Sequence, residues 1–355
     1  MPLAFHAHHE HKYRLRVAAQ RVLQKESGIG FFEIIPRSSG KTILEYDDDT
    51  FDMLERDDVV VGICPADCGS DDVISAILRF PELKQLHLGR TEVTDAQLRR
   101  IAKLSLLEEL ELIHTGITDD GVAHLASLRR LRKLDLRQTK VSGAALIYLS
   151  SMTHLEHLDL AYNNIGGDAL RPLTGLCSLQ RLDLAHTSIV DDSLRPLASL
   201  ASLRILDLSH TNISGPGLAY LSSLMRLEEL DLTGTEVHDD SLPPLAGLSG
   251  LIALTLTKTR VRDKGVISLR SLPSLSSLAL EGCAISDAAL PCLAEMISLK
   301  RLYVDCTSVS AQGAARFHSL TPTATINWGR AGETMKEIGS DGIVREFHVQ
   351  RDDDW

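Results

Sequence analysis

Aromatic side chains are scarce in this sequence: they make up 4% of its 355 residues, although hydrophobic residues reach 44%. The core therefore has to be built mostly from Leu, Val, Ile and Ala. Such a core suits small, similar structural units better than one irregular globule. The length fits either two ordinary domains or one elongated repeat domain with caps.

Three other absences exclude classes of protein. The first residues, MPLAFHAHHEHKYRLR, lack the apolar stretch of a secretory signal. No segment approaches the ~18 uninterrupted apolar residues of a membrane helix. The six cysteines are scattered without the spacing of a disulfide framework. We therefore expect a cytoplasmic protein with reduced thiols.

Positive charge is also in deficit. The formal net charge is −11, which argues against general affinity for nucleic acid or anionic membranes, because both favour basic surfaces. If charge guides association, it favours a basic partner.

The sequence does contain an unbroken repeat. Leucine recurs every 24 residues and divides residues 83–322 into ten repeats without an insertion, starting at Leu83, Leu107, Leu131, Leu155, Leu179, Leu203, Leu227, Leu251, Leu275 and Leu299. The shared pattern is LxxLxLxxTx(I/V)(T/S)DxxLxxLxxLxx, and we number the places of each repeat from its first Leu.

Each repeat combines two periodicities. Leu182 and Leu184 alternate as in a strand with one buried face, whereas Leu194, Leu197 and Leu200 recur at spacings of three, as on one side of a helical or 3₁₀ turn. One repeat cannot bury its leucines alone, so the repeats have to stack into a continuous core. Strands pack more closely than helices, and the stack should therefore curve with its strands innermost.

Two polar places are expected to join neighbouring repeats. Place 9 is a small polar residue, Thr or Asn in all repeats except the ninth, which has Cys283. Its side chain can satisfy buried backbone groups of adjacent repeats. Place 13 is often Asp, directly before the helical segment, and Thr94 to Gln97 has the spacing of a capping box.

The pattern, seen for example in LEELELIHTGITDDGVAHLASL from Leu107 to Leu128, resembles bacterial leucine-rich repeat proteins. The resemblance covers about two thirds of the chain. It implies an α/β fold: a leucine-rich repeat solenoid (horseshoe) with parallel strands on the concave face and short helices on the convex face, capped at both ends. It also implies a protein-binding, non-enzymatic role, although a fold alone does not fix a function.

The two ends depart from the pattern. We predict a His-rich flexible tail over 1–12, an N-terminal cap over 13–82, ten repeats over 83–322, and a C-terminal capping strand with an acidic tail over 323–355. The cap would contain a helix near 13–26, a strand near 30–36 and a degenerate first coil, because terminal repeats have to shield the core. Residues 323–328 would continue the strand pattern.

Motifs for chemistry are weak. SSGKT (38–42) looks like the end of a phosphate-binding loop, but Ile35 stands where that loop needs its first glycine. The residues after SSGKT also lack the pattern of the helix that such a loop requires. The N-terminal histidines would hold metal only weakly, because ordering a tail costs entropy. We find no nucleophile, base and oxyanion arrangement and predict neither an enzyme, nor a cofactor, nor a resident metal.

The concave face carries the variable residues. Place 5 is acidic in six consecutive repeats, and parallel strands lie ~4.8 Å apart, so these carboxylates should form a negative stripe with neighbours repelling by roughly 1 kcal/mol in water. The predicted partner-binding residues are Glu111, Asp135, Arg137, Asp159, Tyr162, Arg181, Asp183, His186, Asp207, His210 and Asp231.

Three interpretations of this face remain open. It could bind a protein or peptide, with a basic segment as the favoured partner. It could bind a metal or small ligand, for example through His186, His210, Asp183 and Asp207. Alternatively, the aspartates are inherited repetition, and the chain is a scaffold that makes its contacts through the caps or the convex side.

Overall fold

The computed structural model describes residues 31–35, 59–64, 70–329 and 335–347. The chain divides into two compact units, an N-terminal unit of residues 1–164 and a C-terminal unit of residues 165–355. The boundary lies between places 10 and 11 of the fourth repeat, so both units are built from the same kind of coil.

In the N-terminal unit, short strands alternate with short helices. The elements are β1 (Phe31–Ile35), β2 (Val59–Cys64), α3 (Asp71–Ile77), β3 (Gln85–His87), α4 (Asp95–Ile101), β4 (Glu109–Glu111), α5 (Asp119–Leu125), β5 (Lys133–Asp135), the 3₁₀ helix η1 (Gly143–Ala145), α6 (Leu146–Leu149) and β6 (His157–Asp159). Strands β2 to β6 pair in parallel in chain order, and β1 pairs antiparallel with β2.

The C-terminal unit repeats this alternation, with 3₁₀ helices in place of several α-helices. The elements are η2 (Arg171–Gly175), β7 (Arg181–Asp183), η3 (Asp191–Ser199), β8 (Ile205–Asp207), η4 (Pro216–Ser223), β9 (Glu229–Asp231), η5 (Asp239–Ser241), η6 (Pro243–Gly247), β10 (Ala253–Thr255), α7 (Asp263–Leu269), β11 (Ser277–Ala279), α8 (Leu290–Ala294), β12 (Arg301–Tyr303), α9 (Ala311–Leu320), β13 (Thr325–Trp328), β14 (Met335–Ile338) and β15 (Val344–Phe347). Strands β7 to β13 are parallel, and β14 and β15 close the sheet antiparallel.

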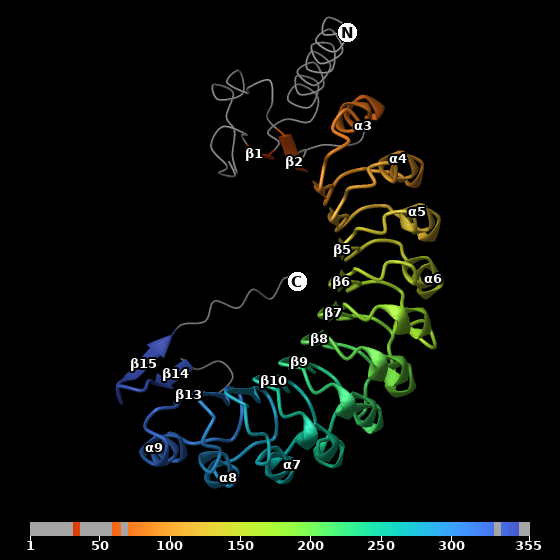
Figure 1. Cartoon of the computed structure of the whole chain (residues 1–355). Helices are drawn as coiled ribbons and strands as arrows, with labels where there is room; N and C mark the ends of the chain where they lie inside the picture. Colours follow the sequence, from red (N-terminus) through yellow and green to blue (C-terminus); the bar gives the residue numbers. More distant parts are fainter. Residues whose placement is uncertain (1–30, 36–58, 65–69, 330–334, 348–355) are drawn as a thin grey trace, which may run out of the picture. The chain divides into compact units, whose positions relative to one another are not determined.

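The leucines of the pattern form the core of each coil. Leu182, Leu184, Leu194 and Leu197 have no exposed surface, and the corresponding leucines of the other repeats are equally buried. Each fully buried Leu contributes roughly 1.5–3 kcal/mol of hydrophobic stabilisation. In both units the helices lie on the side of the coils opposite the strands (Figure 1). The predicted leucine-rich repeat solenoid is confirmed.

The polar residue at place 9 acts differently from our expectation. The threonine hydroxyl donates to the carbonyl three residues earlier in its own coil, as in Thr187 Oγ1 to Leu184 O at 2.6 Å. Only longer or softer side chains reach the preceding coil: Asn163 Nδ2 donates to Leu136 O at 2.7 Å, and Cys283 Sγ lies 3.0 Å from Leu256 O. Most of the threonines thus stabilise the turn of their own coil. Thr139 Oγ1 also donates to Asn163 Oδ1 of the next coil at 3.0 Å, and Thr259 Oγ1 lies 3.3 Å from Cys283 Sγ.

The aspartate at place 13 joins the coils instead. Asp287 Oδ1 accepts from Ser310 N at 2.8 Å and its Oδ2 from Ser310 Oγ at 2.6 Å, one repeat further on. The same bond to the next repeat is made by Asp95, Asp119, Asp191, Asp239 and Asp263. Glycine at place 15 leaves room for this carboxylate, because a Cβ on Gly313 would lie 2.0 Å from Asp287 Oδ1.

The chain ends agree with the predictions only in part. Ile74, Ile77 and Phe80 are buried as a degenerate first coil requires, and Ile326 and Trp328 of β13 continue the core. Residues that we expected only as a tail form β14 and β15, where Ile338 is buried. The domain limits remain predictions. The N-terminal histidines, the helix near 13–26 and SSGKT lie outside the described residues.

Candidate functional site

The outward side of the strands, here called the strand face, consists of the side chains at places 3, 5, 7 and 8 of each repeat. Along β8 the leucine at place 4 is buried, whereas Ile205 and Asp207 on either side of it are half-buried. Because successive side chains of a strand point to opposite faces, every strand adds two outward residues to this surface.

The aspartates at place 5 close a turn at the end of each strand. Asp207 Oδ1 accepts from Ser209 N at 2.8 Å, and Asp231 Oδ1 accepts from Thr233 N at 2.8 Å. Asp135, Asp159 and Asp183 make the same bond to the residue two positions later. The repetition of Asp at this place therefore has a structural cause. Asp183 is also only 8% exposed, so our expectation of an open solvent stripe is wrong there.

In the N-terminal unit, cations neutralise the strand face. Arg137 Nη2 lies 3.1 Å from Asp135 Oδ2 and 3.0 Å from Asp159 Oδ2. Lys133 Nζ lies 3.2 Å from Glu109 Oε2. Arg137, which we predicted as a partner-binding residue, is thus a direct bridge between two carboxylates of its own chain.

His87 and Glu111 form the first pair of this unit, with His87 Nδ1 2.8 Å from Glu111 Oε2. This hydrogen bond to Glu111 raises the pKa of His87, although burial opposes the rise. The hydrogen bond with His87 correspondingly lowers the pKa of Glu111. The pair favours an imidazolium and a carboxylate, and it leaves little net charge at this end of the face.

In the C-terminal unit, Asp207 and Asp231 have different electrostatic surroundings. Among the described residues, neither Asp207 nor Asp231 forms an ion pair with Lys or Arg, and Arg181 in β7 is exposed. Burial raises the pKa of Asp231, and the charge of Asp207 raises it further. A cation brought to this surface would therefore stabilise the ionised carboxylates.

The residues at place 8 adopt left-handed backbone. Tyr162 has φ of 58° and is 46% exposed in the N-terminal unit. In the C-terminal unit, His186 and His210 both have φ of 54°, whereas the following repeat has Gly234 at this place. A side chain in this conformation costs roughly 1–2 kcal/mol relative to glycine. The three predicted place-8 residues are therefore divided between the two units.

The two histidines stack on each other. The ring centroids of His186 and His210 lie 4.3 Å apart with an interplanar angle of 17°. Burial lowers the pKa of His186, and the neighbouring His210 lowers it further, whereas Asp207 opposes the shift. The stack thus favours an uncharged His186 ring and presents an aromatic platform beside Asp207.

Glu281 and Asp305 were not among the predicted partner-binding residues. Both occupy place 7, where Thr257 Oγ1 donates to Glu281 Oε2 at 2.6 Å. Asp305 Oδ1 is buried without a hydrogen-bond partner in the described structure. Burial, followed by the charge of Glu281, raises the pKa of Asp305 to about 6. The sequence could have indicated this arrangement, because two consecutive repeats have an acidic residue at place 7.

The part of the chain that the structure describes shows neither a metal-binding cluster nor a membrane-spanning helix. No group of three or more His, Cys, Asp and Glu side chains there is placed to hold a metal ion. In the same part of the chain, every helix is too short or too polar to span a bilayer.

Comparison with known proteins supports the repeat assignment. A leucine-rich repeat family model matches residues 129–189 and 153–213. An internalin from Listeria monocytogenes has a similar structure, with TM-score 0.60 and 21% identity over 90% of this chain and 88% of the internalin. A leucine-rich repeat protein from Leptospira interrogans has TM-score 0.51 and 19% identity over 71% and 74% of the two chains.

A mammalian structure is also similar. The mouse RP105/MD-1 complex matches with TM-score 0.54 and 22% identity, covering 68% of this chain and 41% of that one. At these identities the likenesses show a shared fold. The comparison with curated proteins gives no match. The repeats, the coil geometry and these matches together identify the chain as a leucine-rich repeat protein with a fold like that of bacterial members such as the internalins.

Proposed function

We propose that this chain is a non-enzymatic binding module that holds a protein or peptide partner with a basic segment on the strand face of its C-terminal unit. Leucine-rich repeats commonly mediate protein–protein interaction. One of the similar structures is a complex, that of mouse RP105 with MD-1.

The observation that carries the proposal is the pair of carboxylates on β8 and β9. Asp207 Oδ1 and Asp231 Oδ1 each accept from a backbone N–H to close a turn, and Asp231 is also hydrogen-bonded by the side chain of Thr233. Both are on the strand face without a Lys or Arg partner in the described structure. A partner's lysine or arginine would supply the missing countercharge and strengthen the surrounding hydrogen bonds.

The histidine stack adds a second type of contact. Planar rings of His186 and His210 favour stacking with a guanidinium or an aromatic side chain, which contributes about 0.5–1 kcal/mol at an exposed site. Both residues keep large side chains where the left-handed backbone favours glycine. Arginine-rich segments therefore fit this surface better than lysine-rich ones.

We also propose a reducing, cytoplasmic location. Cys177, Cys283, Cys292 and Cys306 are all free thiols, which supports that proposal.

The test is fluorescence anisotropy with a fluorescein-labelled, arginine-rich decapeptide and an aspartate-rich decapeptide of equal length. The full chain should bind the basic peptide and not the acidic one. Asp207→Asn/Asp231→Asn should weaken binding about tenfold, which corresponds to about 1.4 kcal/mol.

The matched control removes the same charge from the other unit. Glu109→Gln/Asp135→Asn should leave the affinity within about twofold. Equal weakening by both double variants would mean that only net charge matters, and the proposed site would be wrong.

A second measurement uses the natural partners. Proteins captured from the native cell extract by the wild type should be lost with Tyr162→Ala/His186→Ala/His210→Ala. An unchanged set of captured proteins would contradict binding by the strand face.

A further inference from the structure

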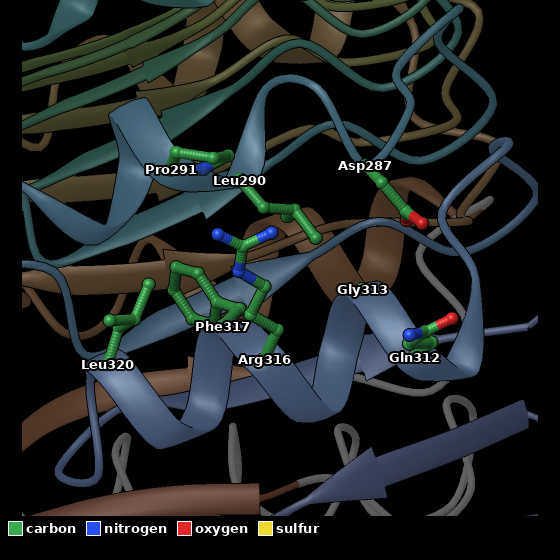
Figure 2. Close-up of a pocket in the computed structure, with 8 residues that line it drawn as sticks. All are labelled: Asp287, Leu290, Pro291, Gln312, Gly313, Arg316, Phe317 and Leu320. Carbon is green, nitrogen blue, oxygen red and sulfur yellow. The ribbon is translucent and has the colours of Figure 1, made fainter.

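A small cleft lies between α8 and α9, on the helix side of the C-terminal unit (Figure 2). Its volume is about 120 Å³. Leu290 and Phe317 form a buried apolar floor, with 3% and 1% of their surface exposed. An apolar cavity of ~150 Å³ can hold a benzene ring, so this cleft has room for one aliphatic side chain.

Leu320, at the end of α9, stands exposed at the mouth of the cleft. It occupies place 22, which holds a buried Leu or Met in the nine preceding repeats: Leu104, Leu128, Met152, Leu176, Leu200, Leu224, Leu248, Leu272 and Met296. Leu320 is 58% exposed instead. The sequence pattern predicts a core residue here, and that prediction is wrong.

The length of α9 explains the displacement. This helix extends over ten residues, Ala311–Leu320, whereas α8 has five and ends at Ala294, two places earlier in its repeat. The two additional residues at the end of this helix carry the side chain at place 22 out of the core. A leucine left in water forgoes roughly 1.5–3 kcal/mol of hydrophobic stabilisation, and contact with an apolar partner group would recover part of it.

The charge around the cleft is uneven. The Arg316 guanidinium points across the cleft toward Pro291 and Leu290 (Figure 2), and it forms no ion pair within the described residues. At the other end, Asp287 is occupied by its two hydrogen bonds with Ser310. The rim next to the apolar floor therefore offers one positive charge that is available to a carboxylate.

We propose that this cleft is a second docking site, which takes an aliphatic side chain from a partner segment with Asp or Glu beside it. The aliphatic group packs on Leu290, Phe317 and Leu320, and the carboxylate pairs with Arg316. The preferred charge is opposite to that of the segment expected on the strand face. The two surfaces accordingly select different peptides, and one can exist without the other.

The test uses a random-peptide phage library, selected on the immobilised full chain. The expected enriched peptides share an aliphatic residue next to Asp or Glu. Arg316→Glu should change the acidic preference to Lys or Arg, because it reverses the charge at the rim. Leu320→Glu should weaken binding of the enriched peptides at least tenfold.

The control is Ile267→Glu, which places the same substitution on another exposed aliphatic residue of the helix side. Ile267 lies in α7 and is 56% exposed, close to the value for Leu320. This variant should bind the selected peptides like the wild type. Thermal unfolding by circular dichroism should show the same midpoint for all three variants, since each position is on the surface.

Several outcomes would overturn the proposal. One is that no enriched peptide responds to Leu320→Glu or Arg316→Glu. A second is that sedimentation shows self-association of the wild type that Leu320→Glu abolishes, because the occupant would then be another copy of this chain. Recovery of only basic peptides, sensitive to Asp207→Asn, would reject the cleft and leave the strand-face proposal standing.

Discussion

The strand faces of the two units share one backbone pattern but differ in how they handle charge. In the N-terminal unit, Arg137 bridges Asp135 and Asp159, and Lys133 meets Glu109. In the C-terminal unit, burial raises the pKa of Asp231, which forms no ion pair with a lysine or arginine in the described structure. A carboxylate of the strand face can therefore be neutralised by a cation of the same chain or remain available to a partner's cation. The residues at places 3 and 7 decide between the two.

This difference separates two roles of the conserved pattern. The bond from the aspartate at place 5 to the turn is present in both units, as in Asp135 and Asp207, and it belongs to the fold. In the described structure an arginine accompanies Asp135 but not Asp207. Binding specificity in this protein thus depends on the residues around the aspartates more than on the aspartates themselves.

The largest expected effect comes from the buried core, and it tests whether the two units differ in packing as well as in surface charge. Leu134→Ala and Leu206→Ala remove equivalent core side chains, each 1% exposed, from β5 and β8. Each should lower the free energy of unfolding by about 2–5 kcal/mol, by the same amount in both units. Urea denaturation measures the loss. A cost that differs severalfold between the two variants would show that the units differ in packing as well as in charge.

An effect of intermediate size concerns the free-energy cost of ionising the partly buried carboxyl group of Asp305. The pKa of Asp305 is raised from 3.8 to about 6, so its contribution to stability is present below pH ~4 and is lost as the pH rises through 6. At pH 7.5 the free energy of unfolding of Asp305→Asn should be about 1–2 kcal/mol higher than that of the wild type. This range allows for the partial exposure of the side chain.

At pH 4 the difference should shrink to about 0.5 kcal/mol or less, because the carboxyl is then protonated in the folded chain and only a little more than half ionised in the unfolded chain. Chemical denaturation at both pH values provides the comparison. Equal stability at pH 7.5 would contradict the assigned burial cost.

The smallest effect comes from making the N-terminal face resemble the C-terminal one. Arg137→Gln removes the bridge between Asp135 and Asp159 and should cost at most about 1 kcal/mol, because the arginine is partly exposed. The loss should disappear in 1 M NaCl, where the Debye length is ~3 Å. Denaturation at low and high salt measures it, and a cost independent of salt would indicate lost packing instead.

The sequence predicts the fold well because the core depends on spacing alone. Leucines at fixed places have to share one interior, and the capping box of Thr94 and Gln97 forms as predicted. β14 and β15 escaped prediction because four-residue strands carry too little periodicity. Leu320 escaped it because helix length, which depends on the whole last coil, overrides the pattern at place 22.

The site is less predictable from sequence than the fold. The outward places and their charges follow from alternation along the strands. The bridge made by Arg137 and the stacking of His186 on His210 depend on rotamers, which spacing does not determine. Glycines at 234 and 282 could have indicated the left-handed turn at place 8, and with it the unusual position of the histidines.

The carboxylate that each place-13 aspartate extends to the following repeat has a consequence for how such a chain can lengthen. Asp239 accepts from Arg262 N, and Asp287 accepts from Ser310 N. Cutting out residues 263–286 would leave both of these acceptors with their donors and join place 12 to place 13. Insertions or deletions of whole multiples of 24 residues therefore keep these hydrogen bonds between repeats. An insertion or deletion of any other length leaves a backbone donor without its aspartate.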